Sequence, residues 1–112
     1  MSDDSKRIAE LNDTFRKSPH DRTRGRSYMT DGVSALGPDF FIRAIAAVAA
    51  FDQFNADNDP YGEHDFGSFG FGEHTIFWKI DYYDKKLEMG SPDPADPAVT
   101  SRVLTVLLSE EY

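Results

Sequence analysis

The residues with the most evident chemistry form one acidic run, Asp57 to Gly67 (DNDPYGEHDFG). Carboxylates at this density, with a glycine between them, are typical of a calcium-binding loop. The spacing does not fit: with Asp57 at position 1, an EF-hand needs a bidentate glutamate at position 12, where this chain has Ser68. Position 5, which should supply an oxygen ligand, is Tyr61. The EF-hand is therefore rejected, and only a weak oxygen-rich cation site stays open.

Two histidines suggest a second metal hypothesis. The tripeptide that ends in His64 (GEH) recurs ten residues later and ends in His74. Imidazoles and carboxylates from both copies could share a divalent ion if the loop folds back on itself. The candidate ligands are Glu63, His64, Asp65 and His74. No helix or strand fixes one copy relative to the other, so the simpler interpretation is that these residues cap turns. We expect no metal and no other cofactor.

Other catalytic patterns are weaker. The tripeptide Asp65-Phe66-Gly67 matches a kinase motif but lacks the glycine-rich and catalytic loops of a kinase. The glycines at 67, 70 and 72 do not follow a strand and open no helix, so they are no dinucleotide fingerprint. No serine has the spacing of a nucleophile elbow, and the chain has no cysteine. We therefore predict no catalytic residues and favour a non-enzymatic function.

The charge is distributed unevenly along the 112 residues. The net charge is −8; residues 1–30 contribute +2, residues 31–73 contribute −7 and the remainder −3. A negative field repels phosphate backbones, so we expect no direct binding of nucleic acid by the middle of the chain. Only the segment His20 to Arg26, with three arginines, could contact an anion, and a solvated basic loop is its simpler interpretation.

Periodicity predicts two helices in the first half of the chain. Ile8, Leu11 and Phe15 form one apolar stripe in a helix over Lys6–Lys17 that Ser5 could cap. A second helix over Phe40–Phe54 is alanine-rich and apolar almost all round, which predicts a central helix buried on most sides. Asp39 is its candidate N-cap. Residues 19–27 between them have the composition of a loop.

The strands are predicted from alternation and turn residues. Asp31-Gly32 between two short mixed runs predicts a hairpin over Ser27–Leu36, and Asp84-Lys85 predicts a second hairpin that continues into Lys86–Gly90. His74–Tyr83 alternates strictly, with Ile76, Trp78, Ile80 and Tyr82 on one face. Arg102–Ser109 is continuously apolar and predicts a central strand covered on both faces, with a C-terminal helix capped by Asp96 as the alternative.

The segment Asn55–Glu73 has neither periodicity and is predicted to be a long loop, ordered by its aromatic residues. Ser91–Pro97, with three prolines, is predicted to be a stiff connection. Together these elements predict one α+β domain over residues 1–112. A small antiparallel sheet of three to five strands would pack against the buried helix, with the N-terminal helix beside it.

Several runs together resemble a known family. NDPYGEHDFG, FWKIDYYD, SPDPADP and RVLTVLLSEEY are similar to an uncharacterised bacterial family, domain of unknown function 3768. The resemblance extends from Ile8 to Tyr112, and the basic stretch His20 to Arg26 matches least well. It implies no activity and no catalytic residues. It implies a context, that of accessory proteins on plasmids and other mobile elements, especially in alphaproteobacteria, where small acidic proteins often neutralise host defence systems.

These observations lead to three hypotheses about function. The first is an inhibitor of anti-CRISPR or anti-restriction type that binds a host protein with a basic surface. Its predicted partner-binding residues are Asp57, Asp59, Tyr61, Glu63, Asp65, Phe69 and Phe71. The second is a metal-binding protein or metal-dependent enzyme, and the third a structural interaction module. With no apolar run long enough for a signal peptide or a membrane span, we expect a cytoplasmic protein without membrane contact.

Overall fold

Strand β4 (Ser101–Leu108) lies inside a four-stranded sheet with the strand order β1-β4-β3-β2 in the computed structural model, which describes residues 3–112. β4 pairs antiparallel with β3 (His74–Tyr83), and β3 pairs antiparallel with β2 (Phe66–Phe71). β1 (Gly25–Met29) runs parallel to β4. The α+β class and the number of strands are confirmed, and the sheet is mixed rather than wholly antiparallel.

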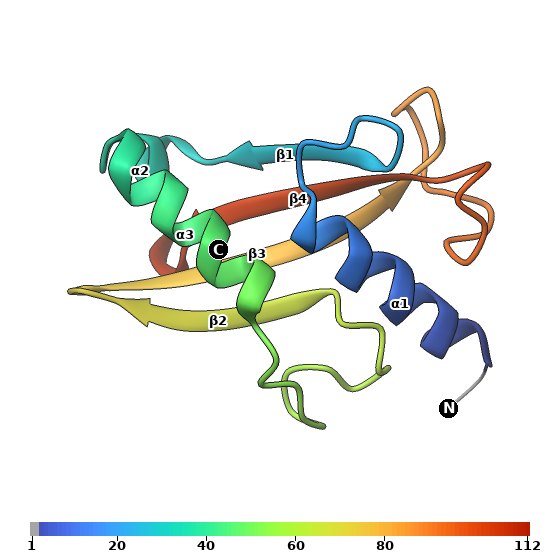
Figure 1. Ribbon diagram of the computed structural model, residues 1–112, viewed down its shortest axis with the longest axis horizontal. Coiled ribbons are helices and arrows are strands. Elements are labelled where there is room, and N and C mark those ends of the chain that lie inside the picture. Colours follow the sequence, from blue (N-terminus) through green and yellow to red (C-terminus); the bar gives the residue numbers. More distant parts are fainter. Residues whose placement is uncertain (1–2) are drawn as a thin grey trace.

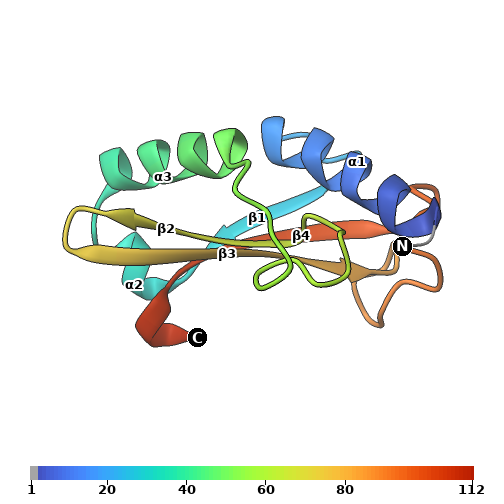
Figure 2. The same ribbon diagram turned by 90° about the horizontal axis from the view of Figure 1, so that it is seen from below.

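Two helices cover one face of this sheet (Figure 2). They are α1 (Asp3–Lys17) and α3 (Pro38–Ala50), which lie end to end and in front of the strands in the view of Figure 1. A short helical turn, α2 (Asp31–Ser34), and a 3-10 turn, η1 (Ser109–Glu111), lie at one end of the sheet. Among residues 3–112, no helix has the length and apolar character needed to cross a membrane.

The core lies between the helices and the sheet. The predicted apolar stripe of α1 is confirmed, since Ile8, Leu11 and Phe15 are buried. The helix begins at Asp3, so Ser5 lies within it and does not cap it. The predicted bounds of β3 are also confirmed, and Ile76 and Trp78 on its inner face are fully buried.

The C-terminal segment is a strand, so the alternative of a C-terminal helix is wrong. β4 is central, as predicted, because β1 and β3 flank it. It is not covered on both faces along its whole length: Leu104 and Val106 are fully buried, whereas Val103 and Thr105 on the opposite face are half-exposed. Burial on both faces occurs only at its end, where Leu107 is 5% exposed.

The second helix is shorter and more exposed than predicted. It ends at Ala50 rather than Phe54, and within it only Ala44 and Val48 are buried, while Ile42 is 65% exposed. Alanine is small and tolerates exposure, so an alanine-rich helix has an apolar sequence without being enclosed. Asp39 is not the N-cap; that position is Gly37, at φ 96°, and Pro38 starts the helix.

The two predicted hairpins are also corrected. Asp31-Gly32 starts the turn α2 instead of reversing the chain, because β1 pairs with β4 and the Glu111 carboxylate accepts a hydrogen bond from the Gly32 N–H at 3.1 Å. After β3, the chain makes a single bridge between Tyr83 and Gly90, without a further strand. Long-range pairing therefore overrules the local turn signal at Asp31-Gly32. At Asp84-Lys85 the chain does turn back, with the Asp84 N–H donating to the Met89 carbonyl at 2.8 Å, but it forms this bridge instead of the predicted strand.

The prediction of one long loop over Asn55–Glu73 is wrong for its second half, which forms β2. Burial alternates along this strand from Gly67 to Phe71, but glycine and serine dilute the strand signal in its sequence, FGSFGF. One of these glycines has a packing role. A Cβ on Gly67 would lie 2.3 Å from Nε1 of the buried Trp78, so only glycine fits at this position.

This close approach yields a stability prediction. Gly67→Ala should lower the free energy of unfolding by about 1–3 kcal/mol, because the bulky indole must shift within a packed core. Gly70→Ala in the same strand is the matched control: a Cβ there meets nothing within 4 Å, so stability should be unchanged or slightly raised. Urea unfolding of both variants checks this, and equal midpoints would contradict the proposed contact.

Candidate functional site

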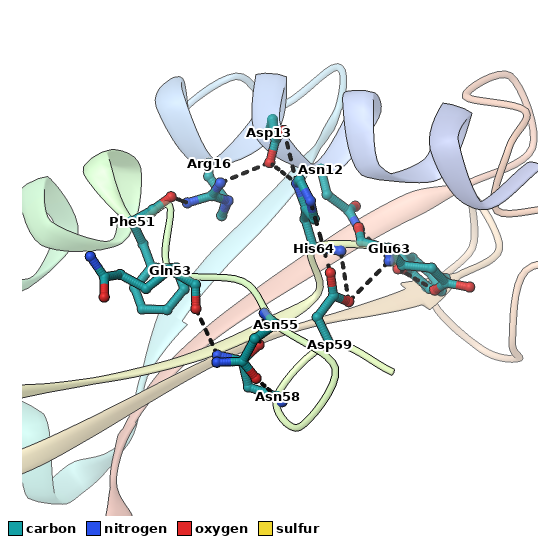
Figure 3. Close-up of polar contacts among 11 residues, drawn as sticks. Asn12, Asp13, Arg16, Phe51, Gln53, Asn55, Asn58, Asp59, Glu63 and His64 are labelled. Atoms are coloured by element: carbon teal, nitrogen blue, oxygen red, sulfur yellow. Dashed lines mark hydrogen bonds and ion pairs between the residues drawn. The ribbon is translucent and has the colours of Figure 1, made fainter. Parts of the chain in front are cut away.

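The acidic loop, residues 51–65, connects α3 to β2 and lies beside the edge of the sheet formed by β2 (Figure 1). Its first turn is closed by two asparagines. Asn55 Oδ1 accepts hydrogen bonds from the N–H groups of Asp57 and Asn58, and Asn58 Nδ2 donates to the carbonyl of Gln53 at 2.8 Å. The loop therefore has its own hydrogen-bonded framework (Figure 3).

The seven predicted partner-binding residues do not form one exposed surface. Asp57 and Tyr61 are exposed, Tyr61 by 74%. Asp59 is only 8% exposed, and Glu63 and Asp65 are half-buried. The two remaining residues, Phe69 and Phe71, lie on β2 and pack against the core. Of the predicted surface, Asp57 and Tyr61 are thus exposed to solvent, whereas the other five residues are partly or wholly buried.

Asp59 stabilises the turn that follows it. Its Oδ1 accepts hydrogen bonds from the N–H groups of Glu63, at 3.0 Å, and His64, at 3.2 Å. Gly62 and His64 both adopt positive φ, 69° and 57°. A left-handed conformation is unfavourable for histidine, so the surrounding contacts must hold it there.

His64 is fixed between two carboxylates and a phenyl ring. Its Nδ1 lies 3.0 Å from both carboxylate oxygens of Asp13, and its Nε2 lies 3.8 Å from Asp59 Oδ2. Its ring stacks on Phe54 with centroids 3.9 Å apart. An Asp–His pair can act as a general base when the second nitrogen faces a substrate. Here that nitrogen faces Asp59, so the imidazole serves as a link between α1 and the loop.

Arg16, from the last turn of α1, is the second link (Figure 3). Its Nη1 donates to the carbonyls of Val48, at 2.5 Å, and Phe51, at 3.1 Å, and so caps the C-terminal end of α3. Its Nη2 donates to Asp13 at 2.7 Å. The guanidinium carbon lies 4.8 Å from the ring centroid of Trp78, a cation–π contact. A side chain that is 3% exposed thus joins both helices to the sheet.

Asn12, one turn before Arg16, organises a buried polar network. It is fully buried, and its Nδ2 donates to the Glu63 carbonyl and to the Tyr82 hydroxyl, both at 2.9 Å. Its Oδ1 accepts from Arg102 Nε at 2.6 Å. Both N–H donors of this amide and one of the two lone pairs of its oxygen are therefore used. The network joins α1, the loop, β3 and β4.

Burial changes the acid–base properties of this network. Desolvation is the largest cause that raises the pKa of Tyr82 far above its usual value, so its hydroxyl stays protonated and donates to Glu63 Oε1 at 2.9 Å. Desolvation also lowers the pKa of Arg102, which remains a cation at neutral pH. For Asp65, burial and then the neighbouring charge of Glu63 raise the pKa of the carboxyl above its ordinary value of 3.8.

The candidate metal ligands do not converge. Glu63, His64 and Asp65 lie at the start of β2, whereas His74 follows the other end of that strand, where it pairs with Phe71. The His74 ring meets the edge of Phe40 instead, with centroids 5.9 Å apart. Within residues 3–112, no three histidine, aspartate or glutamate side chains are grouped so as to hold a metal ion.

A family model for a protein of unknown function, DUF3768, matches residues 29–111. The chain belongs to the DUF3768 family. No curated protein and no solved structure matches it. The matched range contains the acidic loop, β2, β3 and β4 but not α1. In this DUF3768 protein, Asn12, Asp13 and Arg16 therefore hold the loop from outside the matched range.

Sequence reasoning missed the residues that anchor the loop. Asn12 lies four residues after Ile8, and Arg16 lies four residues after Asn12, so both fall on the apolar side of α1. This position was a signal that the sequence offered. A polar residue in an apolar stripe indicates a buried partner elsewhere in the chain. No local sequence signal identifies these partners, which for Asn12 include Arg102 and Glu63.

The Asn12 network generates a stability prediction. Asn12→Ala should lower the free energy of unfolding by about 2–4 kcal/mol, because it removes the acceptor of the buried Arg102 Nε and leaves the Tyr82 hydroxyl and the Glu63 carbonyl without their donor. Thr14→Ala, at an exposed position of the same helix, should change it by less than about 0.5 kcal/mol. Hydrogen exchange at the amides of Glu63 and His64 should accelerate in the Asn12 variant. Unchanged exchange there would show that the loop is held by other contacts.

Asp65 generates a prediction about pH. A carboxyl whose pKa is higher in the folded chain than in the unfolded chain destabilises the fold at neutral pH. This penalty decreases as the pH falls through the raised pKa and is gone below the ordinary value of 3.8. Asp65→Asn should therefore stabilise the protein at pH 7, with a gain that shrinks towards pH 3.5.

Urea unfolding across this pH range measures the difference between Asp65→Asn and the unaltered protein. The matched control is Asp57→Asn, at an exposed position of the same loop, where the change should have little effect on stability. A gain for Asp65→Asn that stays constant with pH would mean that burial of the carboxylate is not its cause.

Proposed function

We propose that this DUF3768 protein is a non-enzymatic binding protein that docks on a basic surface of a host protein through the outer side of its acidic loop. We define the outer loop surface as Asp52, Asp57 and Tyr61, the exposed acidic and aromatic residues of residues 51–65. The observation that supports this proposal is that the side of the loop that faces α1 and the sheet is held by hydrogen bonds. Contacts of Asn12, Asp13 and Asp59 fix its inner side and leave these three side chains exposed.

Anchoring favours binding because it lowers the entropic cost of association. A loop that is ordered before binding loses less freedom when it docks than a flexible loop does. Tyrosine is an effective anchor because it offers a large rigid area with a polar end. Tyr61, 74% exposed and next to Gly62, has this character. Only part of the surface expected from the sequence is retained, since Phe69 and Phe71 pack against the core.

Charge supports the choice of a basic partner. The protein has a net charge of −8, and residues 31–73 contribute most of it. Such a field accelerates the encounter with a cationic surface, including a groove that normally holds nucleic acid. The resemblance to proteins of mobile elements suggests that the partner is a host defence protein. Both ring nitrogens of His64 face carboxylates, which favours a binding function over acid–base catalysis.

The test is affinity capture from an alphaproteobacterial lysate at low and at high salt. The tagged protein should retain a basic partner at low salt and release it at high salt, because exposed charges are screened. A triple variant, Asp52→Asn, Asp57→Asn and Tyr61→Ala, should lose this partner. The matched control, Asp39→Asn with Glu73→Gln, also removes two exposed negative charges, but in the first turn of α3 and in the turn between β2 and β3 rather than in the acidic loop, and should keep it.

Urea unfolding of both variants is measured first and should give equal stabilities. Capture of the same partner by the triple variant would overturn the proposal, as would equal loss of the partner in the control variant. The second result would mean that net charge alone, and not the outer loop surface, causes the retention.

A further inference from the structure

We propose that the free edge of β1 is a second binding site, which takes up an extended acidic segment of a partner protein as an additional strand. β1 is the outermost strand on the side of the sheet opposite to β2 and the acidic loop (Figure 1). This site is therefore separate from the outer loop surface, and the inference does not depend on the function proposed for that surface.

The backbone of β1 has unused hydrogen-bonding groups. The Arg24 carbonyl accepts from the Arg102 N–H, and the Thr30 N–H donates to the Val106 carbonyl. In a parallel ladder, alternate residues direct both backbone groups to the same neighbour, so the even-numbered residues face β4. The N–H and C=O groups of Ser27 and Met29 point to the opposite side, where the described chain supplies no partner. Such an edge is a template for another strand.

A basic cavity adjoins this edge. It has a volume of about 340 Å³ and is lined by Pro19, His20, Arg22, Arg26 and Tyr28, among others. The loop before β1 forms its other wall, held in place by a hydrogen bond from Ser27 Oγ to the Pro19 carbonyl at 2.9 Å. The wall that the partner segment would meet is thus ordered before binding.

The arginines of this cavity are available for a ligand. Arg24 is engaged by Asp21, at 3.2 Å, whereas Arg22 and Arg26 are exposed and make no ion pair within residues 3–112. Two guanidiniums without an ion pair line this one cavity, so its charge is positive although the net charge of the chain is −8. Guanidinium groups bind carboxylates through paired hydrogen bonds, which points to aspartate or glutamate as the recognised side chain.

The open face of the sheet indicates the rest of the ligand. Arg26 and Tyr28 project to the face that α1 and α3 do not cover, because they are paired with Val103 and Thr105. Next to Tyr28 lies a hollow of about 260 Å³ that is also lined by Tyr83, Leu87 and Val103. A segment added to β1 would therefore place an acidic side chain beside Arg26 and an apolar one, two residues away, beside Tyr28. Nucleic acid lacks this apolar alternation, and the net charge of the protein repels it.

The probe for the experiment is a fluorescein-labelled octapeptide, Glu-Ser-Val-Ser-Glu-Ser-Val-Ser, in which glutamate and valine take turns on one face of the strand and serine fills the other. Fluorescence anisotropy should show salt-dependent binding, and the double variant Arg22→Gln, Arg26→Gln should bind about tenfold more weakly or worse. Lys85→Gln with Lys86→Gln removes two exposed cations outside the cavity and serves as the matched control, with binding unchanged within about twofold. The same peptide with lysine in place of glutamate should not bind.

Methylation of the peptide backbone distinguishes strand addition, which needs backbone hydrogen bonds, from simple charge attraction. N-methyl groups on alternate residues of the peptide, placed in the phase that faces β1, should abolish binding although the charge is the same. In the complex, the amides of Ser27 and Met29 should become protected from hydrogen exchange.

Four results would overturn the proposal. The first is equal affinity for the N-methylated peptides, and the second is protection elsewhere than at Ser27 and Met29. The third is a dimer of this chain in sedimentation experiments that the Arg22→Gln, Arg26→Gln variant does not form, since the edge would then be filled by a second copy. Tighter binding of a single-stranded oligonucleotide than of the peptide would also contradict it. None of these measurements involves the acidic loop, so failure here and failure of the proposed function are distinguishable.

Discussion

The structure depends on two polar side chains of α1, Asn12 and Arg16, that are buried against the sheet. Burying an amide or a guanidinium costs free energy unless its hydrogen bonds are replaced. Asn12 replaces them with bonds to Glu63, Tyr82 and Arg102. Arg16 donates to two carbonyls at the end of α3 and to the carboxylate of Asp13, while its buried Nε has no hydrogen-bond partner within residues 3–112. Because the partners come from every layer, α1, the acidic loop and the sheet have a single relative arrangement.

This constraint explains why a loop rich in like charges can be ordered. Repulsion among Asp59, Glu63 and Asp65 favours an extended, solvated chain, and burial of Asp65 adds a desolvation cost. The opposing contributions are specific: Asp59 accepts two backbone N–H groups, Glu63 accepts the Tyr82 hydroxyl, and His64 stacks on Phe54. The loop is therefore fixed both by its own contacts and by contacts from Asn12, Asp13 and Tyr82 outside it.

The sequence was a good guide wherever a signal was periodic. The strict alternation of His74–Tyr83 gave the bounds of β3, and the stripe of Ile8, Leu11 and Phe15 gave the buried side of α1. It was a poor guide where the partner is distant. The Asp31-Gly32 pair is a strong local turn signal, but β1 pairs with β4, more than 70 residues later, and the chain follows that pairing. The glycines of β2 hid an alternation of burial, and one of them, Gly67, is needed to admit Trp78.

The same distinction applies to the candidate site. Composition located the acidic segment. It could not distinguish carboxylates that face solvent, such as Asp57, from buried ones that accept hydrogen bonds within the fold, such as Asp59. That separation depends on contacts between residues 51 to 90 positions apart, for example from Asn12 to Glu63 and to Arg102. Folding thereby converts a charge gradient along the chain into a gradient across the sheet. The acidic loop lies beyond the edge formed by β2, and the unpaired arginines lie at the edge formed by β1 (Figure 1). The two edges of the sheet therefore present exposed charges of opposite sign.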